Sequence, residues 1–157
     1  MPSVLFVCTG NQCRSPLAEA FFRERLSRSD WSHNLSVSSA GTWTGDGLPV
    51  MPFCNELARA FGVDLSRHRT HSITSVPIRD FDVIVVMEQG HKEALVSEFP
   101  EIRPRVFLLT SLAGLFPYDI QDPLSVDAET AKDIIKDMRD CVELAFEPII
   151  QAVQAKK

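Results

Sequence analysis

Four consecutive apolar residues near the start of the chain, Val4 to Val7, run directly into the segment CTGNQCRSP at residues 8–16. A short apolar run of this kind is typical of a strand buried on both faces of a parallel sheet. Ser15 is a favoured N-cap residue, and Pro16 suits the first position of a helix, where its missing N–H is not needed. The stretch therefore predicts a strand, a tight loop and a helix, which is the unit from which open α/β sheets are built.

The loop has the composition of an anion-binding site at the carboxyl end of its strand, where open α/β sheets bind ligands. Cys8 and Arg14 are six positions apart and bracket Gly10. Such a loop can turn its backbone N–H groups inward, and the helix adds the positive end of its dipole. This potential favours a thiolate at Cys8, and the planar guanidinium of Arg14 suits two phosphoryl oxygens. A buried structural thiol and a surface ion pair are the alternatives; the strand–loop–helix context favours catalysis.

The rest of the chain alternates between strand and helix patterns. Further strands are expected at 35–39, 83–86 and 106–109, and helices at 54–61, at 91–99 and along an apolar face from 131 to 152 that Pro148 kinks or ends. The alternation predicts one doubly wound α/β domain over residues 1–157, with a four-stranded, mostly parallel sheet and helices on both faces. Residues 41–52 contain three glycines and two prolines and are expected to form a loop at the rim of the site.

Composition excludes several classes of protein. The net charge of −5 argues against a broad nucleic-acid-binding surface. No apolar stretch approaches the roughly 20 residues of a membrane span, and the N-terminus lacks the pattern of a secretory signal. The four cysteines do not suggest a disulfide framework or a tetrahedral zinc site, so we expect no metal and no cofactor. A catalytic thiolate needs a reducing compartment, which indicates a cytoplasmic protein.

Together these motifs resemble the low-molecular-weight protein tyrosine phosphatases over nearly the whole chain. The matching segments are VLFVCTGNQCRSPLAEA at 4–20, SAGT at 39–42, Gly47-x-Pro49, GVDLSRHR at 62–69, FDVIVVME at 81–88 and Asp122-Pro123. The resemblance implies the strand order 2-1-3-4. It also implies metal-free hydrolysis of phosphotyrosine in proteins through a cysteinyl-phosphate intermediate.

The resemblance assigns roles within the loop. Cys8 is the expected nucleophile, and the phosphate-binding residues are Thr9, Gly10, Asn11, Gln12, Cys13 and Arg14. The Ser15 hydroxyl is expected to bond the sulfur of Cys8. Cys13 is expected to form a reversible disulfide with Cys8 that protects it from over-oxidation.

Residues outside the loop complete the expected site. Asp122 is the expected general acid, with Asp119 as the second candidate. Asn11 is expected to take a left-handed conformation, with Ser39 and His68 supporting the loop. The other three histidines, which are His33, His71 and His91, match no motif and are expected at the surface.

The expected wall of the substrate pocket departs from the family pattern. It consists of Gln12, Trp43 and Leu124. Leu124 and Ser125 follow Asp122-Pro123 where many relatives carry tyrosines. Gln12 stands where phosphotyrosine-directed relatives place a bulky aliphatic residue and phosphoarginine-directed ones a threonine. Phosphotyrosine is the first choice of substrate and phosphoarginine the alternative, in either case on a protein modified by a cognate kinase.

Two other functions compete. An arsenate reductase would need further thiols to relay a disulfide, but Cys54 and Cys141 are far apart in sequence and lie on apolar helix faces. A non-catalytic phosphate-binding module would be expected to lack the nucleophile or the acid, and both are present.

Overall fold

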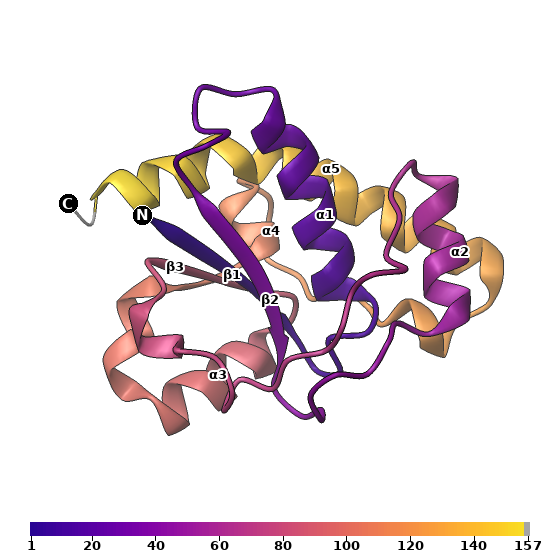
Figure 1. Ribbon diagram of the computed structural model, residues 1–157, viewed down its shortest axis with the longest axis horizontal. Helices are drawn as coiled ribbons and strands as arrows, with labels where there is room; N and C mark the ends of the chain where they lie inside the picture. Colours follow the sequence, from indigo (N-terminus) through magenta and orange to yellow (C-terminus); the bar gives the residue numbers. More distant parts are fainter. Residues whose placement is uncertain (156–157) are drawn as a thin grey trace.

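The computed structural model describes residues 1–155 and contains a four-stranded parallel sheet in the order β2-β1-β3-β4 (Figure 1). The strands are β1 (Ser3–Cys8), β2 (Ser36–Gly41), β3 (Val83–Val86) and β4 (Val106–Leu108). β1 is central, since Val4 pairs with Val37 on one side and with Val83 on the other. The fold class and strand order expected from the sequence are confirmed.

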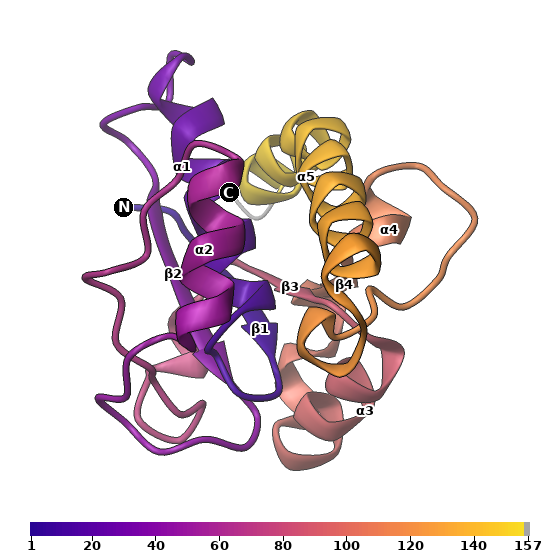
Figure 2. The same ribbon diagram turned by 90° about the vertical axis from the view of Figure 1, so that its right-hand side faces the viewer.

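Helices cover both faces of the sheet, with α1 and α5 on one face and α3 on the other (Figures 1 and 2). The α-helices are α1 (Arg14–Ser27), α2 (Pro52–Ala60), α3 (Gln89–Glu98), α4 (Leu109–Leu112) and α5 (Ala128–Ala155). Short 3-10 turns are η1 (Ile78–Asp80), η2 (Pro100–Arg105) and η3 (Pro123–Ser125). Within residues 1–155, no helix has both the length and the hydrophobicity that crossing a membrane requires.

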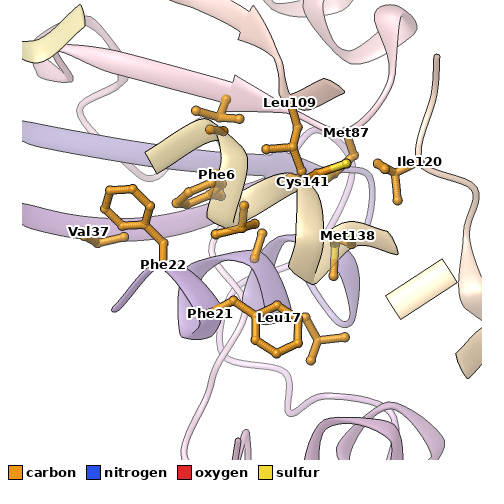
Figure 3. Packing of buried hydrophobic residues seen from close by; sticks show 14 of the residues in the cluster. Phe6, Leu17, Phe21, Phe22, Val37, Met87, Leu109, Ile120, Met138 and Cys141 are labelled. Atoms are coloured by element: carbon orange, nitrogen blue, oxygen red, sulfur yellow. The ribbon is translucent and has the colours of Figure 1, made fainter. Parts of the chain in front are cut away.

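The core is divided by the alternating side chains of β1. Val4 and Phe6 belong to the cluster under α1 and α5, whereas Leu5 and Val7 belong to the cluster under α3. Figure 3 shows Phe6 against Phe22 of α1, with ring centroids 5.5 Å apart. Because all four apolar residues of β1 are fully buried, the end of this strand is a rigid support for the loop that follows.

Most element boundaries differ from the sequence expectation by one to three residues, among them those of β4 and α5. β4 ends at Leu108, and Leu109, expected in the strand, begins α4. α5 continues through Pro148 to Ala155, although a proline was expected to kink or end it. Buried residues on both sides of Pro148, among them Ala145, Phe146, Ile149 and Ile150, keep that helix packed on the core, and this packing outweighs the lost backbone hydrogen bond.

Candidate active site

The loop at residues 8–14 leaves the carboxyl end of β1 and is held by the end of β2. Thr42 N–H donates to the carbonyl of Cys8 at 2.9 Å, and Trp43 N–H donates to that of Thr9 at 3.0 Å. A Cβ atom on Gly41 would lie 2.5 Å from the carbonyl oxygen of Thr9. Only glycine fits at this position, which explains why the SAGT segment at 39–42 has a glycine at residue 41.

Cys8 lies at the floor of the loop, 3% exposed, against the first turn of α1. Its Sγ is 3.0 Å from Ser15 Oγ and accepts the backbone N–H of Ser15 at 3.4 Å. Ser15 Oγ accepts a hydrogen bond from Asn11 Nδ2 at 2.8 Å, and its own hydrogen has two acceptors within reach, the sulfur at 3.0 Å and the carbonyl of Ala40 at 3.4 Å. The contact between the Ser15 hydroxyl and the Cys8 sulfur that the resemblance implied is therefore present.

Ser15 is not the N-cap that its sequence position predicted. α1 begins at Arg14, Cys13 stands at the N-cap position, and no side chain caps the helix. The expectation was wrong because the hydroxyl of Ser15 is directed to Cys8 and Asn11 instead of to a helix N–H.

Asn11 has φ 54°, the left-handed conformation expected for it. Its Nδ2 donates to Ser39 Oγ at 3.0 Å, and its Oδ1 accepts the backbone N–H of His71 at 2.9 Å. Its carbonyl lies 2.9 Å from His68 Nε2, and since a carbonyl only accepts, this ring nitrogen carries the hydrogen. Burial lowers the pKa of His68, in keeping with a neutral ring. Ser39 and His68 thus contact the loop residue that they were expected to support.

Arg14 is 5% exposed and joins the loop to two other segments. Its Nη1 is 2.5 Å from Glu88 Oε2 and 2.7 Å from the carbonyl oxygen of Ile120. Sequence reasoning missed Glu88. The signal was present, because Glu88 lies two residues after β3, which is next to β1, and neighbouring parallel strands end at the same edge of the sheet.

The contact to Ile120 brings the segment with both candidate acids to the loop. Asp119 is already engaged, since its Oδ1 accepts the N–H of Gln89 at the start of α3 at 2.8 Å. Asp122 accepts the N–H of Leu124 at 2.9 Å, caps η3 and is half-buried. Of the two carboxylates, Asp119 holds α3, whereas Asp122 holds only its own turn.

Cys13 is not paired with Cys8. It forms a disulfide with Cys54, with Cα atoms 5.6 Å apart, and both residues are buried. The expectation differed because helical periodicity shows that Cys54 is buried but not which residue it meets. The first turn of α2 packs beside the N-cap of α1, so Cys54 lies next to the loop and not only in the core. Cys141 is a buried free thiol, and burial raises its pKa.

His91 is also misplaced by sequence reasoning. It was expected at the surface, but it is 5% exposed, and its Nε2 lies 2.8 Å from Thr9 Oγ1 of the loop. His33 and His71 are exposed, as expected.

The residues expected to form the pocket wall are solvent-accessible. Trp43 is 86% exposed and Leu124 is 39% exposed. Gln12 Nε2 donates to the carbonyl of Pro49 at 3.1 Å, so the loop is also bonded to the variable segment 41–52. Among residues 1–155, no three His, Cys, Asp or Glu side chains are grouped so that they could hold a metal ion.

A parallel sheet that presents a cysteine and an arginine in one tight loop, with a serine bonded to the sulfur, defines a cysteine-dependent phosphatase site. Comparison with known proteins agrees. Residues 3–157 match the family model described as low molecular weight phosphotyrosine protein phosphatase. The chain is therefore a member of that family, and it is a cysteine-dependent protein phosphatase, a hydrolase.

Relatives named for two substrate classes are similar to the chain. The probable low molecular weight protein-tyrosine-phosphatase EpsP of Ralstonia nicotianae is 31% identical over 151 residues, which cover 96% of this chain and 97% of that protein. The protein-arginine-phosphatase of Bacillus subtilis is 31% identical over 140 residues, covering 89% of each chain. The crystal structure of the low molecular weight protein tyrosine phosphatase from T. tengcongensis has a TM-score of 0.83 at 30% identity, covering 94% of this chain and 99% of that one.

Proposed function

We propose that the protein hydrolyses phosphotyrosine in proteins and that Cys8 is its nucleophile. The observation that carries this proposal is the position of Cys8 Sγ, 3.0 Å from Ser15 Oγ and 3.4 Å from Ser15 N at the start of α1. The thiolate attacks phosphorus, the bond to the tyrosine oxygen breaks, and a cysteinyl-phosphate forms. Water then cleaves the sulfur–phosphorus bond and releases inorganic phosphate.

Arg14 supplies the charge that the transferring phosphoryl group needs. Its contacts to Glu88 and Ile120 both use Nη1. Nη2 and Nε therefore remain to bind two phosphoryl oxygens side by side, and backbone N–H groups of the loop are proposed to bind the same group. The positive charge that a metal provides in other phosphatases thus comes from the loop itself.

Asp122 is the proposed general acid. It protonates the leaving oxygen as the thiolate attacks, and as a carboxylate it then takes a proton from the attacking water. The contact from Arg14 to the carbonyl of Ile120 supports this role, because it holds the chain two residues before Asp122 against the loop.

The choice between phosphotyrosine and phosphoarginine rests on the expected wall of the substrate pocket, which consists of Gln12, Trp43 and Leu124. The exposed indole of Trp43, whose backbone is bonded to Thr9, offers a flat apolar surface to a phenyl ring. For the alternative, Gln12 uses its Nε2 on Pro49, and its Oε1 has no partner among the described residues and can accept from a guanidinium. The tyrosine assignment comes first because the wall has an aromatic side chain, Trp43, that can lie along a phenyl ring.

Turnover of a phosphotyrosine peptide and of a phosphoarginine peptide of the same sequence, measured side by side, tests the proposal. We expect a higher kcat/KM on phosphotyrosine and no turnover of either peptide by Cys8→Ser. A preference for phosphoarginine would select the alternative. Turnover retained by Cys8→Ser would remove Cys8 as the nucleophile.

A separate assay addresses arsenate reduction, because Cys54 lies close to the loop and could take part in a disulfide relay. Arsenate-dependent oxidation of a thioredoxin system would support a reductase, and we expect none. The proposal further treats residues 1–157 as one phosphatase domain in the cytoplasm, acting on proteins that a cognate kinase has phosphorylated.

A further inference from the structure

His91 lies at the third position of α3 and takes part in a reciprocal cap with Glu88. The backbone N–H of His91 donates to the carbonyl of Glu88 at 3.0 Å, and the backbone N–H of Glu88 donates to His91 Nδ1 at 3.1 Å. Nδ1 is therefore an acceptor, and the ring hydrogen is on Nε2. The cap fixes both the tautomer and the direction of the ring.

The hydrogen on Nε2 points to the phosphate-binding loop. Nε2 donates to Thr9 Oγ1 at 2.8 Å, and Thr9 is the residue directly after the nucleophile. The bond from His91 occupies one lone pair of Thr9 Oγ1. The hydrogen of the Thr9 hydroxyl is then free to point toward solvent, where the side chain is exposed.

Glu88 extends the same network to Arg14. Its Oε2 is 2.5 Å from Arg14 Nη1 and 3.7 Å from His91 Nε2. While the ring is neutral, it does not form an ion pair with the Glu88 carboxylate, which is therefore left to pair with Arg14. A protonated ring would present a donor to the Glu88 N–H and a second cation to the Glu88 carboxylate.

We propose that His91 is a positioning residue for phosphoryl transfer, which in its neutral form holds Thr9 of the loop directly and the guanidinium of Arg14 through Glu88. The inference rests on the proposed function, because it assigns the loop and Arg14 to phosphoryl transfer. A protonated ring keeps the Nε2 hydrogen but loses the Nδ1 acceptor for the Glu88 N–H, so protonation releases the ring from the cap that orients it toward Thr9 and makes turnover sensitive to acid.

The charges around the ring favour its neutral form in the working pH range. Burial is the largest effect and lowers the pKa of His91, and the Arg14 cation lowers it further. The carboxylates of Glu88 and Asp119 act in the opposite direction. Turnover is therefore preserved above the lowered pKa and lost as the pH falls through it.

Two substitutions test the role of the ring, with para-nitrophenyl phosphate as the substrate. A glutamine can accept the Glu88 N–H and donate to Thr9 but does not protonate, so His91→Gln should keep kcat at neutral pH and lose the His91 contribution to the acid limb of kcat. His91→Leu makes neither bond, and we expect kcat to fall about tenfold with KM changed less than about twofold, as for a transition-state contact. His33→Gln, which changes an exposed histidine outside the site, should leave both kcat and its pH profile unchanged.

A double-mutant cycle separates positioning from folding. Thr9→Val removes the hydroxyl that His91 contacts, so Thr9→Val and His91→Leu should cost less together than the sum of their separate effects. An acid limb unchanged in His91→Gln, or full kcat in His91→Leu, would overturn the inference. So would additive losses in the cycle. Cys8→Ser separates failure of the His91 inference from failure of the proposed function. If Cys8→Ser is inactive, the proposed function stands even when the His91 inference fails. If Cys8→Ser still turns over substrate, both the proposed function and the His91 inference are wrong.

Discussion

Asp119 and Asp122 are three residues apart, yet their surroundings give them different tasks. Asp119 accepts the N–H of Gln89 and thereby holds the start of α3. Asp122 accepts the N–H of Leu124, a bond within its own turn, and is half-buried. A carboxyl group needed by another helix is poorly suited to exchange protons in each turnover, so we assign the acid role to Asp122.

Asp122→Asn should lower kcat about a hundredfold or more on substrates with poor leaving groups and much less on para-nitrophenyl phosphate, whose leaving group needs little protonation. Steady-state kinetics on the two kinds of substrate make this comparison. Asp119→Asn is the matched control, because an amide oxygen still accepts the N–H of Gln89; its kcat should stay within about threefold of the wild type. Equal losses on good and poor leaving groups in Asp122→Asn would take that residue out of the acid role.

Between elements, the disulfide from Cys13 to Cys54 joins the start of α1 to the first turn of α2. The closed loop of chain contains α1, β2 and the segment 41–52, which is expected to form the rim of the site. While this bond is intact, the thiol of Cys13 is not available to Cys8. Reversible protection of the nucleophile by Cys13 therefore requires that the bond to Cys54 first be reduced.

Removing this cross-link should destabilise the protein measurably. For a sequence separation of 41 residues, the chain-entropy model gives a loss of about 3–4 kcal/mol in the free energy of unfolding. Urea denaturation should show this loss when dithiothreitol is added to the wild type. Cys54→Ala should be less stable than the oxidised wild type and unaffected by the reductant. Equal stability with and without reductant in the wild type would show that the bond contributes nothing.

At the scale of the whole molecule, two neutral histidines link stability to pH. Burial is the main cause that lowers the pKa of both His68 and His91. The unfolded chain therefore binds more protons than the folded protein once the pH is below the ordinary histidine value of about 6.5. The contribution of the two rings is complete above that value and is lost as the pH falls through their lowered folded pKa values.

We therefore expect the free energy of unfolding to decrease between about pH 6.5 and 5, by up to about 1.4 kcal/mol per pH unit for each histidine. Urea denaturation across this range measures the slope. The variant His91→Gln should have a shallower slope than the wild type, whereas His33→Gln should have the same one. Wild-type stability that is flat across the interval would contradict the prediction.

Much of this architecture follows from local pattern. The apolar runs of β1 and β3 and the left-handed Asn11 were predicted, because burial and backbone preference act within a few residues. The partner of Cys54, the burial of His91 and the contact from Glu88 to Arg14 were not. Each depends on which elements meet in space, and helical or strand periodicity does not report that.

One consequence follows from the backbone bond between Trp43 and Thr9. The indole of Trp43 is 86% exposed, yet its main chain is held at 3.0 Å from the loop carbonyl. An aromatic ring in water changes its fluorescence when a neighbouring group displaces solvent from it. With Trp43 in the pocket wall, as proposed, the emission of this ring, isolated by replacing Trp31, should change when a ligand binds at the loop, without any added dye.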